Sequence, residues 1–278
     1  MVTRIITAIV AICVLVPILI FSDTLVFPIA AVLFTAIAVW EMLRCCNLHK
    51  RLGITVVMLL ASAYPFYGYF ERDRVTFAAT GLAVLLLIVL YLFTYLVFRR
   101  GKVALQEVGI PFLTCFYIIA AFSSLVMLRY DGEYGKYIYL IAFFGAWITD
   151  TFAYFVGRLL GKHKLIVEIS PKKTVEGAIG GVVFCILSML LYGWIISALT
   201  DGAIQANYLL LAISGVFISF VSQVGDLAMS AVKRAYGIKD YGRLFPGHGG
   251  VLDRFDSVLA VSLVLSLLTS VGELFVIA

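Results

Sequence analysis

The sequence predicts an all-α polytopic membrane protein of about nine transmembrane helices, with a cytoplasmic N-terminus and an external C-terminus. Three observations predict it: the composition, the length of the apolar stretches and the distribution of basic residues. Of the 278 residues, 63% are hydrophobic and 13% are charged, whereas soluble domains are about 45–50% apolar. This composition excludes a soluble enzyme, a disordered scaffold and a disulfide-rich secreted module.

Nine apolar stretches have the length of a membrane-spanning helix, about 17 to 25 residues. They are apolar throughout, without the alternation of barrel strands. The first follows Arg4 as in a signal peptide, but no small-residue cleavage motif precedes Ser22, so we expect a retained helix. In order they are Ile5–Phe21, Leu25–Met42, Leu52–Phe70, Val75–Phe98, Val103–Leu128, Tyr137–Leu160, Thr174–Leu199, Tyr208–Met229 and Ser257–Ala278.

The basic residues orient these helices. If the nine stretches alternate across the membrane, 17 Lys and Arg residues fall on the side of Arg4 and 4 on the other. Cytoplasmic loops carry such an excess, so the two longest basic loops are expected to face the cytosol. The net charge of +5 then reflects topology, and we expect no nucleic-acid partner. Arg44, Arg99, Arg100 and Lys102 are expected to be topology determinants and headgroup contacts rather than catalytic residues.

Ionisable side chains are rare inside the first five stretches and frequent in the second half. We therefore expect residues 1–136 to form an N-terminal transmembrane scaffold and residues 137–278 to form the catalytic region, with about four helices and cytosolic basic loops. Asp150 lies roughly 15 Å along the helix axis from the cytoplasmic end of its helix. At such a depth in the membrane, the insertion of a lone aspartate costs about 2.5–3.5 kcal/mol. Tyr154 and Arg158 share its face, so the alternatives are a structural pair and a site role.

Three further groups of polar residues surround the cytosolic ends of the later helices. Asp226 is followed at helical spacing by Ser230 and Arg234, and Asp253 and Asp256 stand three residues apart. A Gly-rich loop precedes Asp253, and such backbone can form an anion-binding nest. The loop after Leu160 holds Ser170, Pro171, Lys172, Lys173 and Thr174, which is typical of a helix entry, where anions bind. Gly177 and Gly181 favour close helix packing.

Carboxylates beside fixed cations indicate a particular chemistry. Mg²⁺ is commonly held by one or two carboxylates and by substrate phosphates, and Lys, Arg and backbone amides bind phosphate. The pattern therefore predicts metal-dependent phosphoryl or nucleotidyl transfer at the membrane surface. The sequence contains no Walker, HExxH or GxSxG motif, which gives no support to P-loop, zinc-protease or serine-hydrolase chemistry.

The segment from Ser230 to Asp256 resembles the signature of phosphatidate cytidylyltransferases, also called CDP-diacylglycerol synthases. The residues that carry this resemblance include Lys239-Asp240 and the run Phe245-Pro246-Gly247-His248-Gly249-Gly250-Val251-Leu252-Asp253-Arg254-Phe255-Asp256. The helix of Asp150 and the block from Ser170 to Gly177 resemble the same family. The likeness is strong over residues 145–257, and the first half resembles the family only as a multi-helix region.

This resemblance implies Mg²⁺-dependent transfer from CTP to phosphatidic acid, giving CDP-diacylglycerol and pyrophosphate, by an enzyme of the cell membrane whose site faces the cytosol. It implies a dimer, which the GxxxG pair of Gly177 and Gly181 also suggests, and it leaves room for a second cation such as K⁺. Asp226 and Asp253 are the expected metal ligands. The other expected catalytic residues are Asp150, Asp256, His248 and Lys239. The expected substrate-binding residues are Ser170, Lys172, Lys173, Ser230, Lys233, Arg234, Gly249, Gly250 and Arg254.

Three other functions agree less well with the sequence. A CTP-dependent polyprenol kinase resembles this family in its last helices, but the complete signature argues against it. CDP-alcohol phosphotransferases carry a different aspartate-rich motif that this sequence lacks. A transporter with Asp150 and Asp226 as ion-relay groups predicts charges deep in several helices, whereas most charges here gather on one side.

Overall fold

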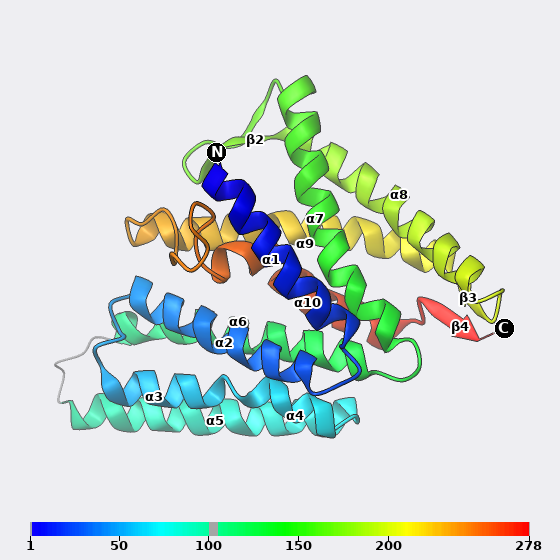
Figure 1. Cartoon of the computed structure of the whole chain (residues 1–278). Coiled ribbons are helices and arrows are strands. Elements are labelled where there is room, and N and C mark those ends of the chain that lie inside the picture. Colours follow the sequence, from blue (N-terminus) through cyan, green and yellow to red (C-terminus); the bar gives the residue numbers. More distant parts are fainter. Residues whose placement is uncertain (1, 100–104, 278) are drawn as a thin grey trace. The chain divides into compact units, whose positions relative to one another are not determined.

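The computed structural model of the protein describes residues 2–99 and 105–277. Arg100 and Lys102 lie outside the described residues, and so does the start of the fifth predicted stretch. The helices are α1 Val2–Ile20, α2 Val26–Cys45, α3 Leu52–Ala61, α4 Tyr64–Phe70, α5 Arg74–Phe98, α6 Leu105–Tyr130, α7 Gly135–Leu160, α8 Val175–Leu199, α9 Tyr208–Ala235 and α10 Leu252–Val271 (Figure 1).

The all-α polytopic membrane fold is confirmed. In the part of the chain that the structure describes, eight helical segments are long and apolar enough to cross a bilayer, with α3 and α4 counted together as Leu52–Phe70. The apolar run of α1, Ile6–Ile20, is shorter than these eight. The placement of the termini on either side of the membrane stays a prediction.

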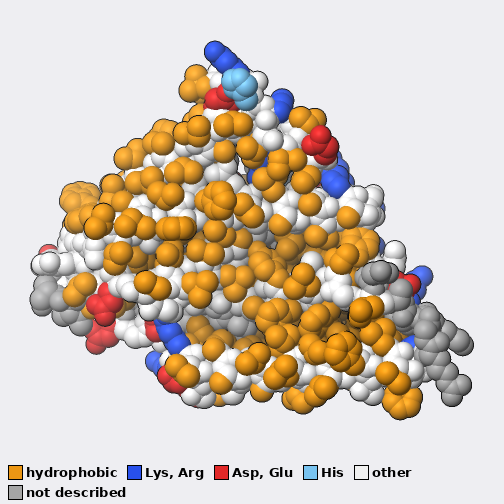
Figure 2. Space-filling model, turned by 180° about the vertical axis from the view of Figure 1, so that it is seen from behind, with side chains coloured by type: hydrophobic (Ala, Val, Ile, Leu, Met, Phe, Trp, Pro, Cys, Tyr) orange, Lys and Arg blue, Asp and Glu red, His pale blue; other side chains and the backbone are white. Residues whose placement is uncertain are grey.

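The surface of the helices is suited to lipid. Only 11% of the residues in the most apolar 18-residue stretch of α5 are buried inside the protein. Large apolar side chains of this helix, such as Leu87 and Phe98, are exposed. Figure 2 shows hydrophobic side chains over most of the visible face, with charged side chains gathered near its margins. Since water does not favour so much exposed apolar surface, this arrangement fits a protein surrounded by hydrocarbon.

Four short strands accompany the helices. Strand β1 (Lys164–Ile166) pairs with β2 (Ser170–Thr174), and β3 (Ile204–Ala206) pairs with β4 (Phe275–Ile277), both antiparallel. Residues 170–174, predicted to form a helix entry, are a strand that leads directly into α8. Helix α8 begins only at Val175, where the Thr174 hydroxyl accepts a hydrogen bond from the Gly177 amide at 3.1 Å.

The last helix also differs from its predicted range of Ser257–Ala278. Helix α10 begins five residues earlier, at Leu252, and ends at Val271. The apolar pattern could not reveal the early start, because Asp253, Arg254 and Asp256 occupy the first turns of the helix. At the other end, the apolar residues Phe275–Ile277 form β4.

By packing, the chain divides into two units. The first comprises residues 1–130 and 236–254, and the second comprises residues 131–235 and 255–278. In the first unit α2 packs against α4 and α6, and α5 packs against α3 and α4. In the second unit α7, α8 and α9 pack against one another. The division falls within α10, after Arg254. The predicted functional division at residue 136 stays a prediction.

Glycines allow α7 and α8 to approach closely, as the small-residue spacing predicted. A Cβ atom on Gly177 would lie 2.5 Å from the carbonyl oxygen of Ala153 and 3.0 Å from the Cα of Gly157. A Cβ on Gly181 would lie 3.1 Å from the carbonyl oxygen of Thr149. The GxxxG pair is thus occupied within the chain, so it no longer supports the expected dimer.

Gly177→Ala is expected to destabilise the protein by about 1–3 kcal/mol, because the new methyl group must push the backbone of α7 away from α8. The matched control is Gly109→Ala in α6, where a Cβ meets nothing within 4 Å. Thermal unfolding in detergent, followed by the fluorescence of a thiol-reactive dye, measures both. Equal melting temperatures for the two variants would contradict the tight packing at Gly177.

Candidate active site

The signature loop, residues 236–251, belongs to the first unit and is shaped by turns. Gly247 and Gly249 have positive φ angles of 79° and 89°, which favour glycine. The Phe245 amide donates to the Gly249 carbonyl at 2.8 Å, and the His248 amide donates to the Phe245 carbonyl at 2.8 Å. The Thr7 hydroxyl of α1 donates to the Pro246 carbonyl at 3.0 Å. The loop therefore has a defined conformation.

Asp253 holds two parts of this loop together. Its side-chain oxygen Oδ2 accepts hydrogen bonds from the amides of Tyr241, at 2.8 Å, and Gly250, at 2.9 Å. A Cβ on Gly249 would lie 2.6 Å from the same oxygen, so glycine is needed for this approach. Asp253 is 7% exposed, which means that the loop encloses it. Gly249 and Gly250, predicted to bind substrate, lie directly against this carboxylate.

A second carboxylate, that of Glu41 in α2, holds the same loop. Its Oε1 accepts a hydrogen bond from the Val251 amide at 3.1 Å, and its Oε2 accepts one from the Leu252 amide at 2.9 Å. A Cβ on Gly242 or on Gly250 would lie 2.1 Å from Oε1. The prediction of a scaffold role for the first half missed Glu41. The available signal was one acidic residue in an otherwise apolar stretch.

The remaining predicted residues of the first unit are cations and a histidine. Lys239 and Arg254 are exposed, and His248 is partly exposed. The Nδ1 atom of His248 is buried and forms no hydrogen bond within the described part of the chain. Exposed cations beside the loop are accessible to phosphate groups.

In the second unit, an ion pair joins the β1–β2 hairpin to α9. The Lys173 Nζ lies 2.5 Å from Oδ2 of Asp226, without the geometry of a hydrogen bond. Both side chains are partly shielded, with exposed fractions of 22% and 27%. Two predicted site residues that are 53 positions apart in the sequence thus meet, one a phosphate-binding candidate and one a metal-ligand candidate.

Two more predicted aspartates lie near Asp226. The Asp256 carboxylate of α10 is close enough to those of Asp226 and Asp150 for repulsion, and to Lys233 for attraction. The Ser257 hydroxyl donates to Oδ2 of Asp150 at 2.8 Å. The second unit therefore gathers three carboxylates and two lysines. A bound cation would reduce the repulsion between the carboxylates, and the lysines would attract phosphate groups.

The other residues predicted in this unit are less closely connected. The Arg158 guanidinium donates to the Tyr154 hydroxyl at 3.4 Å, so these two side chains contact each other on the exposed face of α7. Ser170 and Ser230 are partly exposed, and Lys172 and Arg234 are exposed. The exposed lysine and arginine are accessible to ligands in solution or at the membrane surface.

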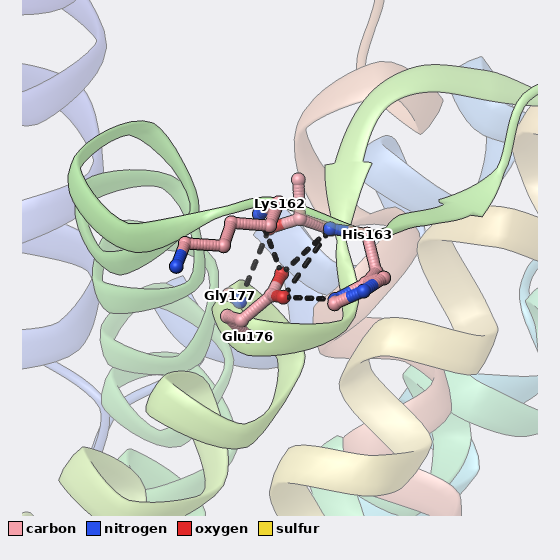
Figure 3. Close-up of polar contacts among 5 residues, drawn as sticks. Lys162, His163, Glu176 and Gly177 are labelled. Atoms are coloured by element: carbon pink, nitrogen blue, oxygen red, sulfur yellow. Dashed lines mark hydrogen bonds and ion pairs between the residues drawn. The ribbon is translucent and has the colours of Figure 1, made fainter.

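The hairpin that carries Lys173 is anchored by Glu176 in the first turn of α8 (Figure 3). Its carboxylate accepts a hydrogen bond from the Lys162 amide at 3.0 Å and contacts Nδ1 of His163 at 2.6 Å. The His163 side chain is 78% exposed. Glu176 thereby fixes the point at which the hairpin leaves α7.

The family model described as "Cytidylyltransferase family" matches residues 2–271. The chain belongs to this family. It is 36% identical over 248 residues to the phosphatidate cytidylyltransferase of Bacillus subtilis, covering 87% of this chain and 88% of that protein. It is 35% and 33% identical over 274 residues to the proteins of the same name from Staphylococcus saprophyticus and Staphylococcus haemolyticus, covering 95% of this chain and 97% of each of them.

Membership of the cytidylyltransferase family confirms the predicted family and the prediction that the chain is an enzyme. The match extends over both packing units and includes the first half, in which the sequence resembled the family only in general terms. Glu41 therefore lies within the part of the chain that the cytidylyltransferase family shares.

The carboxylates of this cytidylyltransferase do not by themselves form a metal cage. Across residues 2–99 and 105–277, no three His, Cys, Asp or Glu side chains form a group that could hold a metal ion. The arrangement of these acidic side chains therefore differs from the closed cage of protein ligands in a structural zinc site. It is compatible with Mg²⁺, which usually retains water and takes ligands from substrate phosphates.

Proposed function

We propose that this member of the cytidylyltransferase family transfers the cytidylyl group of CTP to phosphatidic acid. A phosphate oxygen of phosphatidic acid attacks the α-phosphorus of CTP, the bond between this phosphorus and the β-phosphate oxygen breaks, and pyrophosphate leaves. The products are CDP-diacylglycerol and pyrophosphate. The names of the similar proteins from Bacillus and Staphylococcus support phosphatidate as the acceptor.

The observation that carries the proposal is the ion pair between Lys173 and Asp226 at 2.5 Å. A lysine is suited to phosphate oxygens and an aspartate to a divalent cation. Their contact brings both requirements of nucleotidyl transfer to the same place in the second unit. The lipid phosphate is the nucleophile, so the reaction needs no nucleophilic side chain from the protein.

We assign the metal to the aspartates. Asp226 and Asp253 would hold Mg²⁺, and Asp150 and Asp256 would orient or supplement these ligands. The repulsion of the Asp256 carboxylate by those of Asp226 and Asp150 and the oxygen-only donor set fit a hard divalent cation. When bound, such a cation neutralises charge on the reacting phosphates. A second cation such as K⁺ belongs to the same proposal.

We assign the phosphates to basic and amide groups. Lys172, Lys173 and Lys233 of the second unit, and Lys239 and Arg254 of the first, would bind the phosphates of CTP and of the lipid, together with Arg234. Ser170, Ser230, Gly249 and Gly250 would contribute hydroxyl or amide donors. His248, with its buried Nδ1, would bind a phosphate or transfer a proton.

We further propose that the enzyme lies in the cell membrane with its site facing the cytosol, and that it forms a homodimer. The 17 to 4 distribution of basic residues supports this orientation. CTP is a cytosolic nucleotide, so a cytosolic site gives it direct access.

A turnover assay tests the proposal. Detergent-purified protein is incubated with Mg²⁺, CTP and phosphatidic acid, and the chloroform-soluble cytidine product is identified by mass spectrometry. We expect CDP-diacylglycerol and an equal amount of pyrophosphate, both lost when EDTA removes the metal and when phosphatidic acid is omitted.

The same assay separates the alternatives. Phosphorylation of a polyprenol at the expense of CTP, without product from phosphatidic acid, would assign the chain to the kinases. Turnover that persists in EDTA would contradict the metal assignment while leaving the transfer reaction intact.

A further inference from the structure

The signature loop is held by two carboxylates from different parts of the sequence, those of Asp253 and Glu41. Asp253 is a proposed metal ligand, whereas Glu41 has no role in the proposed reaction. Asp253 accepts hydrogen bonds from the amides of Tyr241 and Gly250. Glu41 accepts hydrogen bonds from the next two amides, those of Val251 and Leu252. Three successive amides at the start of α10 are therefore bound to carboxylate oxygens.

The surroundings of Glu41 are shaped to receive it. Glu41 is 5% exposed, and a Cβ atom at Gly242 or Gly250 would have no room beside its oxygen Oε1. A buried carboxylate in a membrane-spanning helix is costly unless donors satisfy it. Here the donors are backbone amides at the N-terminus of a helix, where negative charge is favoured.

The two carboxylates also repel each other electrostatically. Neighbouring negative charges are unfavourable, so the amide hydrogen bonds of this turn have to offset the repulsion between the two carboxylates. The arrangement is explained if Asp253 is needed for its charge and Glu41 is needed to keep the amides of the turn in place.

We propose that Glu41 is a positioning residue of the active site: through the amides of Val251 and Leu252 it fixes the start of α10 and hence the direction of the Asp253 carboxylate. Glu41 touches neither substrate nor metal in this role. The kinetic part of the inference rests on the proposed function, in which Asp253 is a metal ligand.

Glu41→Gln tests the inference directly. Glutamine keeps the size of the side chain but has one acceptor oxygen, so one of the two amides loses its partner and faces an NH₂ group. Removing an outer-shell partner of a metal ligand lowers metal affinity or activity by about 10–100-fold. We expect kcat/KM to fall within this range and the Mg²⁺ concentration for half-maximal activity to rise about tenfold.

Hydrogen–deuterium exchange gives a readout that does not depend on activity. In Glu41→Gln we expect faster exchange in peptides covering residues 241–254, with the rest of the protein unchanged. The matched control is Thr35→Val, also buried in α2, because the Thr35 hydroxyl donates only within its own helix, to the Ala31 carbonyl at 2.6 Å. The control is expected to retain wild-type exchange in the loop and wild-type Mg²⁺ dependence.

Gly242→Ala disturbs the same contact from the side of the loop and serves if Glu41→Gln does not fold. Its effect and that of Glu41→Gln are expected to be less than additive in the double variant, because both remove one interaction. Wild-type loop exchange in Glu41→Gln, or changes no larger than those of Thr35→Val, would overturn the inference. A wild-type protein that forms no CDP-diacylglycerol would refute the proposed function, whereas the exchange experiment would still decide the role of Glu41.

Discussion

Asp253→Asn is expected to lower kcat about 10³-fold while leaving an inserted, folded protein. A metal ion supplies several kcal/mol of transition-state stabilisation, and each 1.36 kcal/mol corresponds to a factor of ten in rate. Because Oδ2 accepts both loop hydrogen bonds, the amide oxygen of asparagine can replace it. The variant therefore removes the charge and largely preserves the loop.

The measurement is kcat for CDP-diacylglycerol formation at saturating CTP, with the melting temperature recorded on the same preparation. The control is Asp201→Asn, at an exposed position with a positive φ of 50° that asparagine also tolerates. Turnover of Asp253→Asn near that of the control would remove Asp253 from the active site.

Lys173→Ala is expected to raise the KM for CTP or for phosphatidic acid and to lower kcat/KM by about 10–100-fold. This range corresponds to the loss of one charge-assisted hydrogen bond between the lysine and a substrate phosphate, about 1.5–3 kcal/mol. The lysine lies 2.5 Å from Asp226, so its loss also leaves a partly shielded carboxylate without its ion pair. Folding is expected to be affected less than binding, since the lysine lies in a short strand at the surface of the second unit.

The control for this substitution is Lys164→Ala, an exposed lysine of the paired strand β1. Initial rates over a matrix of CTP and phosphatidic acid concentrations separate the two KM values. If Lys173→Ala and Lys164→Ala give the same constants, Lys173 contributes to membrane topology and not to substrate binding.

Much of the fold was predictable because a membrane imposes simple rules. A helix that crosses hydrocarbon must be apolar over a fixed length, and helices occupy each of the nine predicted stretches. The predicted element boundaries were wrong where polar residues form part of a helix or a strand. The charged start of α10 and the strand at Ser170 show no apolar period, so periodicity could not assign them.

The contacts of the site were only partly predictable. Asp226 and Lys173 were each singled out from local spacing, yet their pairing depends on how α8 and α9 pack against α7. Glu41 was missed because its partners are backbone amides, and amides have no signature in the side-chain pattern. A lone acid within an apolar stretch was the signal to follow, since lipid tolerates such a residue only when it has partners.

The contact between Glu41 and Val251 also has a consequence for biogenesis. The two residues are 210 positions apart, and translation proceeds at about 5–20 residues per second. For roughly 10–40 seconds after Glu41 is synthesised, the amides that receive its carboxylate do not yet exist. Until then the Glu41 carboxylate of the nascent α2 lacks these two donors, and a buried carboxylate without donors is costly in hydrocarbon. Completion of the first unit therefore waits until residues 236–254 have been synthesised.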